Sequence, residues 1–196
     1  KKSCNLSTIG STSFFPSKPL GCYGDGGALF TNDDDLADKF RWIRVHGQQQ
    51  KHHHPILGLN GRMDTLQAAI LLEIFELFPE EVEKRNQIGE YYSSQLNKID
   101  YLQIPVIGEG NTSVYAQYTI LGKERKRIQM ALKSADIPSV SYYSVPLHLQ
   151  PVFNGLEQNV GDFPVTEKVA TRCLSLPMSP YLTNEEQEKV IQAIKF

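Results

Sequence analysis

The chain has 196 residues, of which 40% are apolar and 21% are charged, and its formal net charge is −2. This length and composition indicate a soluble globular protein of one or two domains. No apolar run approaches the ~20 residues that a membrane-spanning helix needs, and no basic block indicates a nucleic-acid partner. We therefore expect neither a membrane nor a nucleic acid among its partners.

Three cysteines, Cys4, Cys22 and Cys173, lie far apart and form no Cys-x-x-Cys pair. This pattern is typical of a reducing compartment rather than of a disulfide framework, so we expect a cytoplasmic protein. The sequence does not begin with methionine, and residues 1–9 are typical of a strand already in progress. We expect a fragment of a longer protein, inactive by itself.

One lysine stands in a segment rich in glycine and proline, residues 11–27. Pro19 disfavours the helical conformation at Lys18, and Pro16 stiffens the chain before it, so the lysine can be held in one orientation. The glycines that follow allow sharp turns, after which residues 28–31 are typical of a buried strand. A lysine in such a loop is usually a solvated surface residue. Alternatively, its amine can form a Schiff base with an aldehyde such as pyridoxal phosphate.

The run Ser-Phe-Phe-Pro-Ser-Lys from Ser13 to Lys18, ahead of the glycine-rich turn, closely resembles the Schiff-base motif of the DegT/DnrJ/EryC1/StrS sugar aminotransferases. The resemblance implies that Lys18 forms the Schiff base with pyridoxal 5'-phosphate and acts as the catalytic base. It also implies that the Ser13 hydroxyl binds the cofactor phosphate. Some family members are dehydratases with histidine at the lysine position, so the lysine of this chain favours amino transfer.

Three segments have the periodicity of helices. Residues 32–43 begin with capping aspartates and place Leu36 and Phe40 on one face, which predicts a packing helix. Residues 65–78 are apolar nearly all round and predict a buried helix, in part at a subunit interface. Pro79 fits the first turn of a further helix, over residues 79–96, that links two domains.

Residues 46–64 contain glutamines, glycines and three adjacent histidines and are predicted to form a long loop. Adjacent side chains diverge, and no cysteine or carboxylate stands at ligand spacing, so we expect no metal site. The run from residue 58 to residue 64 resembles a family loop that crosses a dimer interface, which makes Asn60 a ligand of the partner's cofactor phosphate. Arg62 then either binds an anionic group or pairs with a carboxylate, and His53 is a further substrate-binding candidate.

The second half of the sequence alternates short strands and helices. We expect a strand over residues 114–120, with helices over 124–135, around 165–172 and after Thr183, and a strand at 173–176. Residues 142–151 resemble the substrate-side loop of the family. His148 and Tyr143 could contact the sugar there, or the segment could be an aromatic turn packed on the domain edge.

Together, these patterns and the resemblance imply an α/β fold-type-I transferase that depends on pyridoxal phosphate. Residues 1–97 would be the last part of the large mixed-sheet domain, and residues 98–196 a small α+β domain. The expected enzyme is a homodimer with shared sites that moves an amino group from L-glutamate to a UDP-linked keto sugar. The resemblance favours a 2-acetamido-3-keto-hexuronic acid, for bacterial surface polysaccharide. The alternatives are a 4-keto-6-deoxy nucleotide sugar, or a non-catalytic interaction module.

Overall fold

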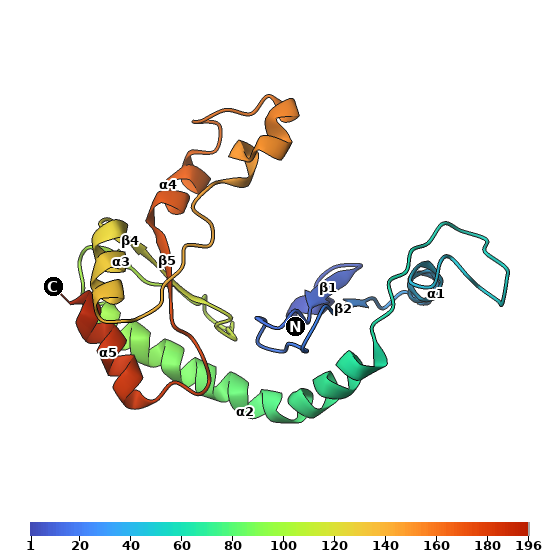
Figure 1. Ribbon diagram of the computed structural model, residues 1–196, viewed down its shortest axis with the longest axis horizontal. Coiled ribbons are helices and arrows are strands. Elements are labelled where there is room, and N and C mark those ends of the chain that lie inside the picture. Colours follow the sequence, from blue (N-terminus) through green and yellow to red (C-terminus); the bar gives the residue numbers. More distant parts are fainter. Residues whose placement is uncertain (196) are drawn as a thin grey trace. The chain divides into compact units, whose positions relative to one another are not determined.

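The structure is a computed structural model that describes residues 1–195. It divides into two compact units, Lys1–Pro79 and Glu80–Phe196 (Figure 1). The dividing point lies inside one long helix that belongs to both units. The division of the protein into domains at residue 97 stays a prediction. Among residues 1–195, no helix combines the length and the apolar character that a membrane crossing requires.

The unit Lys1–Pro79 is built around a two-stranded antiparallel sheet that is followed by helices. Its elements, in chain order, are η1 (Ser3–Asn5), β1 (Gly10–Ser13), β2 (Gly27–Phe30), α1 (Asp34–Ile43) and the first part of α2 (Thr65–Leu96). Strands β1 and β2 pair in a register that places Ser13 opposite Gly27. The loop between these two strands carries Lys18.

The first strand begins later than the sequence predicts. Residues 1–9 form the 3-10 turn η1 followed by bends, and β1 starts only at Gly10. Leu6 in this segment is 66% exposed, so no buried apolar face supports an earlier strand. The strand predicted at residues 28–31 is confirmed as β2, but its predicted burial is wrong. Leu29 and Phe30 are exposed, because a sheet of two strands covers little of either face.

Helix α1 is confirmed, with the side chain of Asp33 accepting a hydrogen bond from the Leu36 amide at its N-terminus. The two helices predicted over residues 65–78 and 79–96 are instead one continuous helix, α2, with Pro79 inside it. Proline removes one backbone hydrogen bond at this point, and the helical turns on both sides of it continue.

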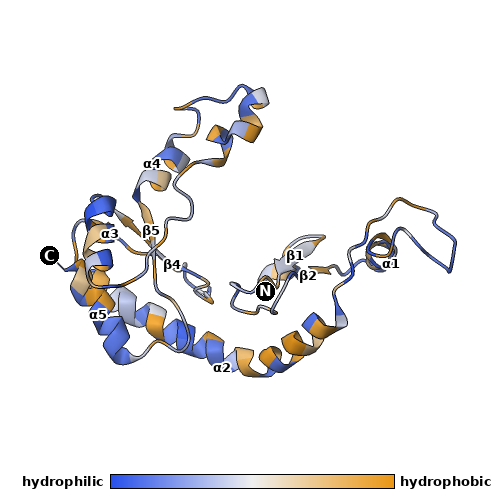
Figure 2. Ribbon diagram, viewed as in Figure 1, coloured by the Kyte–Doolittle hydropathy of each residue, from blue (hydrophilic) through white to orange (hydrophobic). Residues whose placement is uncertain are grey.

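The first half of α2 exposes large apolar side chains. Leu66 is 70% exposed, Leu72 67% and Phe75 54%. Figure 2 shows the change along α2 from a hydrophobic first half to a hydrophilic second half. The predicted burial of this segment is therefore wrong for the single chain. Its partial burial at a subunit interface stays a prediction.

The unit Glu80–Phe196 contains a three-stranded antiparallel sheet with the order β3-β4-β5. Its elements after α2 are β3 (Leu102–Gln103), β4 (Tyr118–Gly122), α3 (Arg125–Ser134), η2 (Leu147–Leu149), η3 (Pro151–Leu156), α4 (Pro164–Arg172), β5 (Cys173–Leu176) and α5 (Asn184–Ile194). The predicted helices over residues 124–135, around 165–172 and after Thr183 are confirmed as α3, α4 and α5. The strand predicted at residues 173–176 is confirmed as β5.

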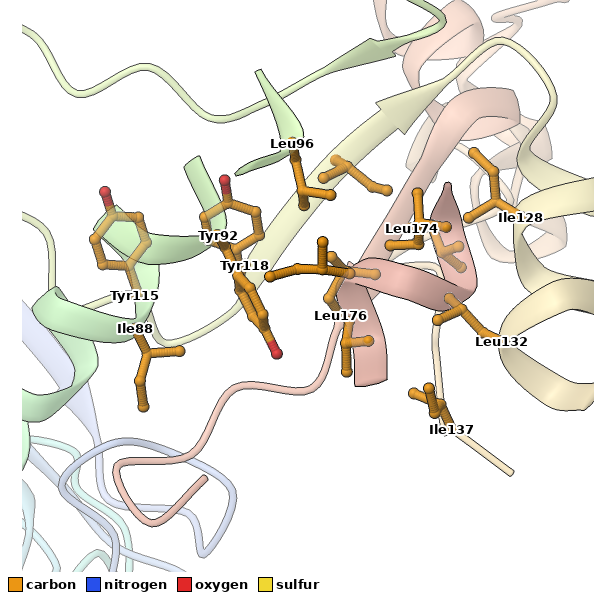
Figure 3. Close-up of a cluster of buried hydrophobic side chains, with 14 residues drawn as sticks. Ile88, Tyr92, Leu96, Tyr115, Tyr118, Ile128, Leu132, Ile137, Leu174 and Leu176 are labelled. Atoms are coloured by element: carbon orange, nitrogen blue, oxygen red, sulfur yellow. The ribbon is translucent and has the colours of Figure 1, made fainter. Parts of the chain in front are cut away.

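Fourteen buried side chains form the core of this unit, between the second half of α2, the sheet, α3 and α5 (Figure 3). Tyr92 and Tyr118 are fully buried, with ring centroids 5.2 Å apart in an edge arrangement. The strand predicted over residues 114–120 is only partly correct, because β4 begins at Tyr118. Tyr115 has a φ of +43°, which a continuing strand cannot adopt, and its ring lies against Gly89.

Glu167, in the first turn of α4, holds the residues that precede this helix. Its carboxylate accepts a hydrogen bond from the Gly161 amide at 2.8 Å and another from the Phe163 amide at 3.3 Å. His148 Nε2 lies 3.2 Å from the same carboxylate, and the His148 ring packs on Phe163. The hydrogen bond from Gly161 is the main cause that lowers the pKa of Glu167, against the opposing effect of partial burial.

A lowered pKa means that ionised Glu167 stabilises the folded state above its unfolded-state pKa of about 4.3, and that this stabilisation is lost as the pH falls through the folded-state pKa. We therefore expect Glu167→Gln to lower the thermal unfolding midpoint at pH 7, and the difference from the wild type to shrink toward pH 3. Melting curves followed by circular dichroism over this pH range measure both effects. Glu109→Gln, at an exposed loop position, is the control. A deficit in Glu167→Gln that is the same at every pH would contradict this account.

Candidate functional site

Lys18 lies in a closed loop between β1 and β2, which we call the Lys18 loop (residues 14–26). The ends of this loop are joined by a hydrogen bond from the Phe14 amide to the Gly26 carbonyl, at 2.8 Å. The Cys22 amide donates to the Phe14 carbonyl at the same distance, and the Lys18 amide closes a turn by donating to Phe15. The backbone that carries Lys18 is therefore restrained, while its side chain is exposed.

Two residues inside the Lys18 loop, Gly21 and Cys22, lie in close contact with backbone carbonyl groups of the loop. A Cβ atom at Gly21 would lie 2.7 Å from the Phe15 carbonyl oxygen and 3.1 Å from that of Lys18, so only glycine fits there. Cys22 is 1% exposed, and its Sγ lies 3.1 Å from the carbonyl oxygens of both Phe14 and Gly24. Sequence reasoning found the glycine and missed the role of this cysteine, because nothing in the cysteine spacing indicated it.

Ser13 is the last residue of β1 and stands at the mouth of the same loop. Its hydroxyl oxygen accepts a hydrogen bond from the Phe15 amide at 3.2 Å. Accepting this bond leaves the hydroxyl proton available for donation to a ligand. Ser13 and Lys18, which the sequence predicted to act together, thus project from one short, restrained segment.

Asn60 and Arg62 lie in the Asn60 segment (residues 58–64), which runs antiparallel to the chain just after α1. Val45 and Asn60 form an isolated bridge, and the Gly61 amide donates to the Arg44 carbonyl at 2.9 Å. Within residues 1–195, the side chains of Asn60 and Arg62 make no hydrogen bond or ion pair, and both residues are exposed. Their backbone is fixed and their polar groups are free to bind a ligand.

Backbone crowding specifies glycine where this segment crosses the chain after α1. A Cβ atom at Gly58 would lie 1.9 Å from the backbone nitrogen of Gly47, and Gly47 itself has a φ of +71°. The Lys18 loop and the Asn60 segment also approach each other, because a Cβ atom at Gly26 would lie 3.1 Å from the Met63 methyl group.

The histidines of residues 52–54 lie in an exposed turn. Gln50 and His53 form an isolated bridge, and His54 Nδ1 lies 3.0 Å from the His46 carbonyl oxygen. His53, the substrate-binding candidate, is exposed. Among residues 1–195, no group of three or more histidine, cysteine or acidic side chains is arranged to hold a metal ion.

A groove of about 1040 Å³ in this unit is lined by β1, β2, α1, the beginning of the chain, and Arg44, Gly61 and Met63. None of the predicted site residues lines this groove.

Two further candidates lie in the unit Glu80–Phe196 and differ in how available they are. The His148 side chain is 7% exposed and is engaged with Glu167 and Phe163. Tyr143 is 74% exposed, beside the ring of Tyr142. Tyr143 can reach a ligand as it stands, whereas the geometry of His148 is that of a side chain supporting the segment around it.

Comparison with known proteins gives this arrangement a context. The model of the DegT/DnrJ/EryC1/StrS aminotransferase family matches residues 1–195. The chain is 50% identical over 182 residues to the UDP-2-acetamido-2-deoxy-3-oxo-D-glucuronate aminotransferase of Pseudomonas aeruginosa, covering 93% of this chain and 50% of that protein. The chain thus spans about half the length of the curated relatives that it matches.

Among the solved structures that match the fold are two that cover nearly the whole of this chain. A DegT/DnrJ/EryC1/StrS aminotransferase from Brucella abortus is 43% identical, with a TM-score of 0.90 over 96% of this chain and 50% of that one. NtdA from Bacillus subtilis, solved with bound cofactor PMP, is 28% identical, with a TM-score of 0.90 over 100% of this chain and 47% of that one. These matches confirm the predicted α/β, fold-type-I class. The chain belongs to the DegT/DnrJ/EryC1/StrS aminotransferase family.

Proposed function

We propose that the complete protein is a pyridoxal 5'-phosphate-dependent aminotransferase that moves an amino group from L-glutamate to a UDP-linked keto sugar. The observation that carries the proposal is Lys18, exposed on a loop whose backbone is closed by hydrogen bonds and by the lack of space at Gly21. A restrained backbone that carries a free amine meets the geometric need of a lysine that must react with a carbonyl group.

The donor groups of this unit fit a phosphate-bearing aldehyde. Lys18 offers an amine to the aldehyde, and Ser13 offers a free hydroxyl proton to the phosphate, while the exposed Asn60 amide offers a further donor to the phosphate held by a second subunit. When bound, pyridoxal phosphate supplies an electron sink that stabilises a carbanion at the α-carbon of the amino donor. Lys18 is then the base that takes the proton from this carbon, and the acid that delivers a proton in the reverse half-reaction.

The proposed enzyme is a homodimer in which Asn60 of one subunit serves the site of the other. Leu66, Leu72 and Phe75 support this arrangement, because they form an exposed apolar stretch of α2 directly after the Asn60 segment. A twofold dimer that buries this stretch would place the same segment of each subunit near its partner.

The proposed substrate is a UDP-linked 2-acetamido-3-keto-hexuronic acid. The reaction would take place in the cytoplasm, and its product would be used for bacterial surface polysaccharide. The relative from Pseudomonas aeruginosa, which is named for that class of substrate, supports this choice. A hexuronate adds a carboxylate to the diphosphate, and Arg62, which makes no ion pair within residues 1–195, is the cation that could bind it. His53 and Tyr143 are exposed and are proposed as further substrate contacts, while His148 would act through its neighbours.

We expect Lys18→Ala in the complete protein to lower kcat by about a thousandfold or more, because the variant loses both the Schiff-base amine and the proton-transfer group. The circular dichroism spectrum should not change, since the Lys18 side chain is exposed and supports no packing. Steady-state assays with L-glutamate and the keto sugar measure the effect. Lys39→Ala, on the exposed side of α1, is the control and should retain full activity. Wild-type activity in Lys18→Ala would reject the proposed role.

We expect mixed dimers of Lys18→Ala and Asn60→Ala subunits to regain activity that neither parent has. If Asn60 acts across the interface, each mixed dimer has one site with both residues intact. Random exchange of subunits should then give about a quarter of wild-type activity. The assay compares the mixture with each parent after subunits have been exchanged. No gain over the parents would show that Asn60 serves its own subunit or no site.

We expect the complete enzyme to turn over the UDP-linked 3-keto-hexuronate in preference to a neutral 4-keto-6-deoxy nucleotide sugar. Arg62→Gln should raise KM for the hexuronate by about tenfold or more, because a charged hydrogen bond is lost. The same variant should have little effect on the neutral sugar. Competition assays with both sugars measure the preference. Preferential turnover of the neutral sugar would overturn the substrate proposal and leave the role of Lys18 untouched.

A further inference from the structure

Gln67, near the start of α2, makes a contact far along the sequence with the Lys18 loop. Its side-chain Oε1 accepts a hydrogen bond from the Tyr23 amide at 2.8 Å, across 44 positions of sequence. The same side chain lies flat against the next residue of the loop, because a Cβ atom at Gly24 would lie 3.1 Å from both Cδ and Nε2 of Gln67. The amide is therefore held by one hydrogen bond and one close backbone contact.

The hydrogen bond between Tyr23 and Gln67 differs from the other hydrogen bonds of the Lys18 loop in what it connects. The hydrogen bonds of Phe14, Lys18 and Cys22 close the loop upon itself and do not attach it to a helix. The bond from Tyr23 instead attaches the returning side of the loop to the first turns of α2. This bond fixes the position of the loop relative to α2, whereas the internal bonds fix only the conformation of the loop.

The same turns of α2 follow directly on the Asn60 segment. The Ala68 amide donates to the Asp64 carbonyl at 2.9 Å, so the helical hydrogen bonds begin at the last residue of that segment. A movement of the Lys18 loop relative to α2 is therefore a movement relative to Asn60 and Arg62. Gln67 joins the segment that carries the amine of one site to the segment whose Asn60 is proposed to serve the partner's site, so it links the two shared sites of the proposed dimer.

We propose that Gln67 is a positioning residue that sets where the Lys18 loop stands relative to the Asn60 segment. Its catalytic consequence rests on the function proposed above for Lys18. Gln67 acts through the backbone at Tyr23 and Gly24 and touches no reacting atom. Tyr23 is 77% exposed, so water can replace the lost acceptor, and removal of the Gln67 amide shifts the loop more than it unfolds the protein.

Three substitutions separate positioning from general packing. Gln67→Met keeps the length of the side chain and removes the acceptor, whereas Gln67→Glu keeps an acceptor oxygen at the same reach. Gln87→Met makes the same change on the same helix at an exposed position, where the side chain donates a hydrogen bond to Glu83. All three are made in the full chain.

Hydrogen–deuterium exchange in the absence of cofactor is the first readout. We expect the Tyr23 amide to exchange about tenfold faster in Gln67→Met than in the wild type, and protection to return in Gln67→Glu. Gln87→Met should match the wild type at this amide. Unchanged exchange in Gln67→Met, or equal loss of protection in Gln67→Glu, overturns the proposal.

Steady-state kinetics of the complete enzyme are the second readout. We expect kcat of Gln67→Met to fall by about tenfold or more with little change in KM for the sugar, and to recover in Gln67→Glu, because a displaced amine reacts more slowly. If exchange changes as expected while kcat does not, the positioning role is overturned. If Lys18→Ala proves fully active, the proposed function fails, while the exchange data still decide whether Gln67 holds the loop.

Discussion

The arrangement of the site depends on the closure of the chain between β1 and β2. Hydrogen bonds from Phe14 to Gly26 and from Cys22 to Phe14 draw the two sides of the loop together, and the absence of a side chain at Gly21 lets three carbonyl groups converge inside it. Each such bond contributes about 1 kcal/mol net, so the loop keeps its shape only because the bonds and the close packing act together. The result is a fixed backbone with an exposed amine on Lys18, which is what reaction with a carbonyl group requires.

The two units differ in how well their apolar side chains are buried within the single chain. The unit Glu80–Phe196 has its own core, in which Tyr92 and Tyr118 are fully buried, and its stability comes from that core. The unit Lys1–Pro79 presents its candidate residues on loops and leaves Leu66 and Phe75 of α2 exposed. A site built from closed loops beside exposed apolar side chains is suited to completion by further protein surface, in agreement with proposed sites shared between two subunits.

Local signals explain most of what the sequence predicted, and contacts between distant residues explain most of what it did not. Helix α5 begins with a capping box between Thr183 and Glu186, and such a pattern can be found from four consecutive positions. The break expected at Pro79 is absent, because α2 continues through the proline despite the lost hydrogen bond, with Tyr92 and Leu96 of its second half buried in the core. Gln67 could not be found, because a glutamine near the start of a helix has no local feature that reveals an acceptor for an amide 44 positions earlier. The contact of His148 with Glu167 could not be found for the same reason, because Glu167 belongs to a different element.

The central claim is that Lys18 is the lysine that holds pyridoxal phosphate. Reduction of the complete, cofactor-loaded protein with borohydride, followed by proteolysis and mass mapping of the labelled peptide, tests it most directly, because reduction makes the bond to the cofactor permanent. We predict that the phosphopyridoxyl group is found on Lys18 alone. Label on another lysine, such as Lys39 or Lys51, or the absence of label from a protein that transaminates, would contradict the account.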